Sequence, residues 1–409
     1  MLHRIWLGFF LLAAVSASYQ WLALGDAAVF QRMVTASFDM AALSVELAIG
    51  LIGLMSLWLG IVALGEAGGL VAALGRWVSP LFTRLMPEVP KGHPAISSMT
   101  LNLSANVMGL DNAATPLGLK AMKDLQSLNP NPETASNAQI LFLVLNTSSV
   151  TLFPMTVLLY RAQLGAADPA SVFIPILLAT SCSTMAGLLV TAWVQRIKLW
   201  DTVVLAYLLL GGGIILSLMA YFATLTVTQL QQQSSLIANL LIFSLILVFL
   251  ITAHRARVNV YETFIEGAKQ GFQVAIDIIP FLLAMLVAIG IFRASGALDI
   301  LLEMIVALVN LFGGDTRFVD ALPTALMKPL SGSGARAMMV ETMNSHGVDS
   351  FQGLLAATIQ GSTETTFYVL AVYFGSVGIR HGRHALACGL AADFAGIIAA
   401  IFLAYWFYI

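Results

Sequence analysis

The chain has 409 residues, of which 59% are hydrophobic and only 10% are charged. Soluble domains carry about 25% charged residues, so this composition excludes an ordinary soluble domain and predicts a multi-pass membrane protein. The formal net charge of −2 gives no reason to expect a nucleic-acid partner. Cys182 and Cys388 lie in apolar runs, where we expect buried side chains rather than a disulfide or a metal site, and we expect no cofactor.

Residues 1–24 have two interpretations. His3 and Arg4 precede an apolar run, and Ser16-Ala17-Ser18 resembles a weak cleavage site, as in a signal peptide. The apolar run continues to Leu24, however, which is long enough to span about 30 Å of hydrocarbon. We favour a retained membrane helix, and both interpretations place residue 25 outside the cell.

Apolar runs further along the chain predict membrane-spanning helices of about 20 residues. We place them at residues 43–64, 138–160, 171–194, 202–223, 235–253, 273–292, 351–374 and 384–408. Residues 34–42 and 261–272 have amphipathic patterns. Residues 66–86 are typical of an interfacial helix, and residues 297–312 predict a further apolar helix.

A first polar element interrupts this pattern at residues 102–116, which are too polar for a plain span and too apolar for a loop. Its candidate substrate-binding residues are Asn102, Ser104, Asn106, Asn112 and Thr115, which are neutral donors and acceptors beside the single carboxylate of Asp111. Alternatively, these side chains satisfy one another at a helix–helix contact, where small and polar residues are common.

A second polar element runs from Lys328 to Arg336 and contains Ser331-Gly332-Ser333-Gly334. Glycine and serine at the start of a half-helix leave backbone N–H groups unpaired, and such an end attracts anions. We therefore expect Ser331, Ser333 and Arg336 to bind an anionic group. The alternative is a glycine hinge whose two cations reach the membrane interface.

Two predicted spans carry polar residues at their centres. These residues are Asn146, Thr147 and Ser148 in one span, and Gln360, Ser362, Thr363 and Glu364 in the other. Charge is costly at the middle of a bilayer, so Glu364 is our candidate for a coupling or gating carboxylate. The alternative is a Glu364 that is permanently paired with Arg336 or Lys328. Asp277 and Asp393 also lie within spans, and the sequence assigns them no role.

The chain contains an internal repeat. Residues 48–70 align with residues 275–298 if one inserted residue is allowed, and residues 146–149 align with residues 361–364. We therefore divide the chain into an N-terminal helix or signal peptide at 1–33, a first repeat at 34–200, a connecting two-helix hairpin at 201–256, and a second repeat at 257–409.

The basic residues set the orientation of the spans. Most of them fall on the cytoplasmic side, as the positive-inside rule requires, and only Arg32, Arg161, Arg293 and Arg317 fall outside. In this orientation the matched spans 43–64 and 273–292 run in opposite directions. Inverted repeats with interrupted helices are typical of secondary transporters. The alternative is duplication within a structural membrane protein.

The polar elements resemble those of a known family. Residues 102–122 with Leu145-Asn146-Thr147-Ser148-Ser149 are similar to spore maturation protein A, and residues 329–335 with 360–370 are similar to spore maturation protein B. The resemblance covers nearly the whole chain and implies a fused nucleoside-recognition, or gate, membrane protein related to concentrative nucleoside transporters. In those transporters a Gln-Thr-Glu run contacts substrate, and Gln360–Glu364 is similar in composition, with Gly361-Ser362 inserted.

The sequence thus predicts an all-α polytopic protein of the bacterial cytoplasmic membrane, with two inverted repeats and interrupted or re-entrant helices. We expect a secondary transporter or permease for a small polar solute, anionic or nucleoside-like, rather than an enzyme, since no phosphate-loop, HExxH or GxSxG motif occurs. Its expected partners are the lipid bilayer, the solute and a coupling proton or sodium ion, and a homo-oligomer is the candidate assembly. The alternatives are a membrane scaffold for envelope or spore maturation, and a regulatory gate for a partner.

Overall fold

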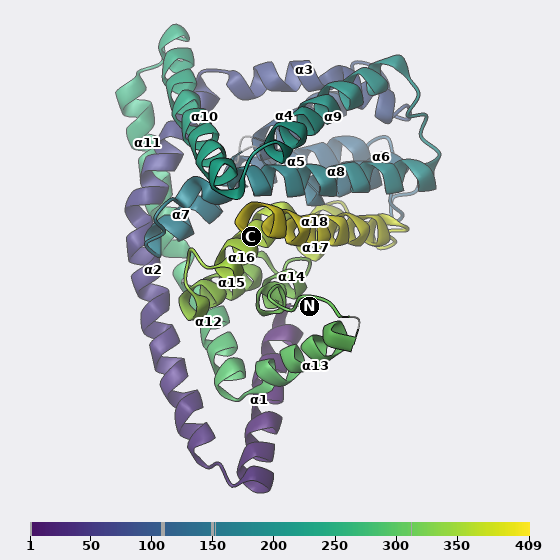
Figure 1. The fold of residues 1–409 in the computed structure, drawn as a ribbon. Helices are drawn as coiled ribbons and strands as arrows, with labels where there is room; N and C mark the ends of the chain where they lie inside the picture. Colours follow the sequence, from purple (N-terminus) through teal and green to yellow (C-terminus); the bar gives the residue numbers. More distant parts are fainter. Residues whose placement is uncertain (1, 108–110, 149–150, 152, 312) are drawn as a thin grey trace.

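The computed structural model describes residues 2–107, 111–148, 151, 153–311 and 313–409. These residues form α-helices, two short 3-10 turns and one isolated bridge, with no strand among them (Figure 1). Seven helical segments in this described part are long and apolar enough to cross a membrane. The prediction of an all-α polytopic membrane protein is therefore confirmed.

The first half of the chain contains ten of the helices. They are α1 (Leu2–Leu24), α2 (Ala28–Ala67), α3 (Leu70–Leu85), α4 (Pro94–Val107), α5 (Asp111–Gln126), α6 (Asn137–Thr147), α7 (Met155–Gln163), α8 (Phe173–Gln195), α9 (Thr202–Ala223) and α10 (Val227–Arg255). The 3-10 turn Pro169–Val172 leads into α8, and α9 and α10 form the hairpin between the two predicted repeats.

The second half begins at α11. Its helices are α11 (Val260–Asp277), α12 (Ile279–Ala294), α13 (Ala297–Leu311), α14 (Leu322–Met327), α15 (Gly332–His346), α16 (Phe351–Ser362), α17 (Thr366–Ser376) and α18 (Ala385–Tyr408). The 3-10 turn Val319–Ala321 precedes α14.

The helix α2 is continuous over 40 residues, so the amphipathic residues 34–42 belong to the same helix as the span predicted at 43–64. No glycine or proline lies between Asp26 and Ile49, and nothing else in the sequence ends the helix there. At 1.5 Å per residue α2 is about 60 Å long, about twice the hydrocarbon thickness of a bilayer. The predicted boundary at residue 33 falls inside this helix.

The helix α2 packs antiparallel against α11 and α12 along one side of the molecule (Figure 1). Glycines allow the backbones to approach closely, since a Cβ atom added at Gly271 would lie 2.4 Å from the Met55 carbonyl oxygen. Further along the pair, Gly290 faces Met40. Residue numbers therefore rise along α11–α12 as they fall along α2, and the two matched spans run in opposite directions.

The helices α8 and α18 form a second antiparallel pair. A Cβ atom added at Gly396 would lie 3.0 Å from the Ser183 Cβ, and one added at Gly187 would lie 3.1 Å from the Ala392 Cβ, so residue numbers rise along α8 as they fall along α18. The Ser183 hydroxyl also donates a hydrogen bond to the Ala392 carbonyl oxygen at 2.9 Å. This pair lies beside the two predicted spans with polar centres, because α18 also packs against α6, α16 and α17.

Both spans with polar centres are interrupted. Span 138–160 is divided into α6 and α7, and span 351–374 into α16 and α17. The polar elements at 102–116 and 328–336 belong to two helical hairpins, α4–α5 and α14–α15. Residues 108–110, which connect α4 to α5, lie outside the described residues. The expectation of interrupted helices is therefore met in both halves of the chain.

Candidate functional site at the helix breaks

The two interrupted spans meet at their breaks. The backbone N–H of Glu364, between α16 and α17, donates a hydrogen bond to the carbonyl oxygen of Thr147, the last residue of α6, at 2.7 Å. A break in a membrane helix exposes backbone polar groups, and these must be satisfied inside the protein or by a lined cavity. Here an N–H group freed by one break donates its hydrogen bond to a carbonyl group at the other break.

The first hairpin reaches the junction through amide side chains. Asn106 Nδ2, at the end of α4, donates to Asn146 Oδ1 at 2.8 Å, and the Tyr373 hydroxyl donates to the same oxygen at 3.3 Å. Asn102 Nδ2 donates to the Ala114 carbonyl oxygen at 2.7 Å and lies 3.4 Å from the Tyr373 hydroxyl. Residues from α4, α6 and α17 therefore form one polar network.

The second hairpin reaches the junction through its backbone. The N–H of Phe367, in the first turn of α17, donates to the Pro329 carbonyl oxygen at 3.0 Å. Ser331 caps α15 by accepting the Gly334 N–H at 3.1 Å, which satisfies one of the N–H groups expected to bind an anion. A Cβ atom added at Gly332 would lie 2.9 Å from Thr365 Oγ1, so the hairpin tip approaches the break closely.

The predicted site residues divide by burial. Asn102, Ser104, Asn146, Thr147, Ser148, Ser331, Gln360, Ser362 and Thr363 are buried, whereas Asn106, Thr115, Ser333, Arg336 and Glu364 are half-buried. The side chain of Asn112 lies outside the described part of the structure. The Ser331 and Ser333 hydroxyl oxygens are 3.2 Å apart.

Several predicted hydroxyl groups have a local explanation. Thr147 and Ser148 both donate to the Val144 carbonyl oxygen, at 3.0 and 2.8 Å, and Ser362 donates to the Ile359 carbonyl oxygen at 2.8 Å. Ser104 bonds to its own helix in the same way. Such bonds satisfy hydroxyl groups inside a helix without any ligand, so amide and carboxylate groups are the stronger site candidates.

The ion-paired alternative for Glu364 does not hold for Arg336, because among the described residues no ion pair joins these two side chains. The Nε atom of Arg336 is buried and has no hydrogen-bond partner in the described structure. Both side chains are half-buried.

Sequence reasoning missed Tyr373 and assigned no role to Asp393. Tyr373 stands in an apolar run of α17, and no neighbouring polar residue marks it. Only the fold brings its hydroxyl to Asn102 and Asn146. The sequence does mark Asp393 as a candidate, because a lone carboxylate in a membrane span is energetically costly.

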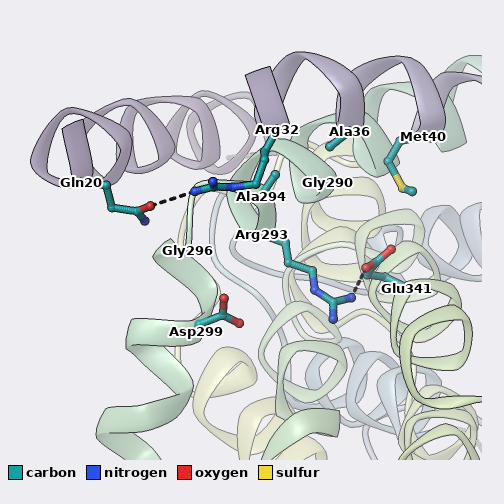
Figure 2. A pocket seen from close by; sticks show the side chains of 10 residues that line it. All are labelled: Gln20, Arg32, Ala36, Met40, Gly290, Arg293, Ala294, Gly296, Asp299 and Glu341. Carbon is teal, nitrogen blue, oxygen red and sulfur yellow. Dashed lines mark hydrogen bonds and ion pairs between the residues drawn. The ribbon is translucent and has the colours of Figure 1, made fainter. Parts of the chain in front are cut away.

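A separate cavity of about 510 Å³ lies among α1, α2, α12, α13 and α15 (Figure 2). Its charged groups are largely paired: Arg293 is ion-paired with Glu341, and Arg32 binds Gln20 Oε1 at 3.2 Å and Asp26 at 2.7 Å. None of the predicted substrate-binding residues lines it. This cavity is therefore distinct from the junction of the breaks.

These features define a multi-pass membrane protein built around two interrupted helices and two helical hairpins. The family model described as Gate, nucleoside recognition, matches residues 48–163 and again residues 275–380, more than half of the chain, and the chain belongs to this family. The two matches lie within the two predicted repeats.

Two curated relatives are similar to parts of the chain. Spore maturation protein B of Bacillus subtilis (strain 168) is 45% identical over 147 residues, which is 36% of this chain and 81% of that protein. Spore maturation protein A of the same organism is 37% identical over 160 residues, which is 39% of this chain and 82% of that protein. No solved structure matches the chain. The resemblance to both proteins is therefore confirmed, and the chain is a multi-pass bacterial membrane protein.

Proposed function

We propose that this protein is a secondary transporter or permease that moves a small polar, nucleoside-like solute across the cytoplasmic membrane. The observation that carries the proposal is the hydrogen bond from Glu364 N–H to the Thr147 carbonyl oxygen, which joins the breaks of two spans. Secondary transporters bind their solutes at such breaks, where the halves of discontinuous helices meet near the bilayer midplane. Both hairpins contact the junction, α4–α5 through Asn106 and α14–α15 through the Pro329 carbonyl oxygen.

We infer that the two repeats are inverted. The helix α2 runs antiparallel to α11–α12, and α8 runs antiparallel to α18. Each of these pairs joins one element of the first half to an element of the second half. A pseudo-two-fold axis in the membrane plane accounts for both pairs and for the contact between the breaks. Alternating access in such proteins is a movement of one repeat against the other around a fixed site.

The chemistry of the junction suits a neutral solute with several hydrogen-bonding groups. Asn106 and Asn146 offer amide groups, Gln360 Oε1 is buried without a partner in the described structure, and Glu364 offers a half-buried carboxylate. Amides and carboxylates bind base edges and sugar hydroxyl groups, and the family description of nucleoside recognition is consistent with such a solute. Arg336 adds a cation for an anionic group.

Solute-dependent stabilisation of the purified protein tests this function. A ligand present at about 100 times its Kd stabilises the folded state by about 2.7 kcal/mol, so nucleosides should raise Tm, whereas dicarboxylates and cell-wall fragments should not. Glu364→Gln should reduce the shift by removing a charged hydrogen-bond acceptor, and Arg336→Ala should weaken binding of anionic analogues. Glu262→Gln, an exposed change on α11, is the matched control and should behave as wild type.

The second candidate function is a membrane scaffold for envelope or spore maturation. The two relatives named as spore maturation proteins favour it. A scaffold should co-purify with a partner protein and should show no change in Tm with any small solute. That result, obtained with a folded wild-type protein, would refute the transport proposal.

A further inference from the structure

Asp393 is a buried carboxylate that the proposed solute site does not use. It lies in the middle of α18 and is 1% exposed, and neither of its carboxylate oxygens has a hydrogen-bond partner in the part of the chain that the structure describes. Burying a charged carboxylate without donors is very costly, especially within a membrane. A carboxylate in this position is stabilised by nearby positive charge, by a bound cation or by a proton.

Two hydroxyl groups at the second break lie near this carboxylate. The buried hydroxyl groups of Thr363 and Thr366 lie close enough to the Asp393 carboxylate to interact with it, but in geometries that leave all four oxygen atoms without a well-formed hydrogen bond. Glycines on α18 permit this approach: Cβ atoms added at Gly389 and Gly396 would lie 2.8 Å from Thr366 Cγ2 and 2.6 Å from Thr363 Cγ2. Asp393 lies between these glycines and faces the break.

The break also releases backbone carbonyl groups. In a continuous helix, the N–H groups of Glu364 and Phe367 would bond to the carbonyl oxygens of Gln360 and Thr363. Here they bond instead to the carbonyl oxygens of Thr147 and Pro329. The C-terminal end of a helix carries partial negative charge, so the end of α16 attracts cations.

The local charges leave room for one more positive charge. Lys328 and Glu364 both lie within electrostatic range of Asp393, and the ordinary charges of these three groups sum to −1. Ser183 from α8 and Thr147 from α6 add neutral hydroxyl groups against this part of α18. One monovalent cation would neutralise the group.

We propose that Asp393, Thr363 and Thr366, with the carbonyl groups released at the second break, form a binding site for a sodium ion. Hard cations prefer carboxylate, hydroxyl and carbonyl oxygens, which are the groups found here. The further claim that this sodium ion is the coupling ion rests on the transport function proposed above, and it assigns the coupling role to Asp393 rather than to Glu364. Sodium binding itself does not depend on that function.

The test is the Tm of the purified full-length protein in detergent, measured while NaCl replaces choline chloride at constant ionic strength and pH. Wild type should show a saturable rise of several degrees with sodium. Asp393→Asn should be at least as stable as wild type in choline, because the unpartnered charge is gone, and should not respond to sodium. Asp277→Asn is the matched control: Asp277 is a span carboxylate that accepts a bond from Gln273 at 2.7 Å, and its removal should leave the sodium response intact.

Thr366→Val provides a second variant that keeps the carboxylate and should weaken the sodium response. A full sodium response in either Asp393→Asn or Thr366→Val would overturn the site. So would a wild-type protein that ignores sodium and is stabilised by acid only when Asp393 is present, since that result identifies a proton site. The change in Tm with nucleosides is measured on the same samples. It does not depend on the sodium response, so the two measurements distinguish failure of the sodium site from failure of the transport proposal.

Discussion

At the scale of single residues, few side chains at the breaks form hydrogen bonds that join the two halves. Most hydroxyl groups at the breaks bond to their own helices, as Ser148 and Ser362 do. Asn146 is different, because its Oδ1 atom accepts from Asn106 in the first hairpin and from Tyr373 in the second half. Replacing a buried acceptor leaves its donors unpaired, so the junction depends on this one amide more than on the surrounding hydroxyl groups.

Glycine at position 396 allows α18 to approach the second break, and this leads to a prediction about stability. A Cβ atom added there would lie 2.6 Å from Thr363 Cγ2 and 3.0 Å from Ser183 Cβ. Gly396→Ala should therefore destabilise the protein by about 1–3 kcal/mol, the usual cost of overpacking. Thermal unfolding in detergent measures the effect.

The control for this prediction is Gly211→Ala, in the middle of α9, where an added Cβ atom would meet nothing within 4 Å. Because alanine favours a helix over glycine, this change should be neutral or stabilising by about 0.5–1 kcal/mol. Equal effects of the two substitutions would show that close packing of α18 on the break is not important for stability.

At the scale of elements, the two breaks differ in how far the sequence predicts them. Pro154 stands at the N-cap of α7 and marks the end of the first break, since proline cannot continue a helix from the preceding turn. The second break, at residues 363–365, contains neither glycine nor proline. It forms because Glu364 and Phe367 donate their N–H groups to other segments, a tertiary effect that no local pattern records.

For the remaining elements too, the sequence predicted the features that depend on local patterns and missed those that depend on tertiary packing. Hydrophobic runs predicted the positions of the long spans, because burial in lipid requires about 20 apolar residues. The length of α2 was not predicted, since the weak amphipathic pattern at 34–42 does not end a helix. The candidate site was recognised as polar residues inside spans, but the contribution of Tyr373 depends on the packing of α17 against α5 and α6.

The antiparallel packing of α2 and α11 gives a prediction about topology. Residue 38 lies toward the end of α2 that faces Gly290, whereas residue 265 lies near Gly60 at the other end. Single cysteines at these positions, in a background without Cys182 and Cys388, should react with a membrane-impermeant reagent from opposite sides, residue 38 from outside. Labelling of both positions from the same side would exclude the inverted arrangement.

At the scale of the whole molecule, the halves are joined by α9 and α10, which are mostly exposed on the surface of the bundle. Only 6% of the most apolar window of α9 and 17% of that of α10 are buried inside the protein. We interpret them as a lipid-facing connection between the two halves. The contacts that hold the halves together are then the two antiparallel pairs and the junction of the breaks.

The central claim is that this junction moves a nucleoside-like solute, and uptake into proteoliposomes tests it most directly. With the full-length protein and an inward sodium gradient, radiolabelled uridine or adenosine should accumulate saturably above protein-free vesicles. Glu364→Gln should reduce uptake about tenfold, which corresponds to about 1.4 kcal/mol, and Glu262→Gln should leave it unchanged. Folded wild-type protein that gives no more uptake than protein-free vesicles, for every nucleoside tested and with or without the gradient, would contradict the account.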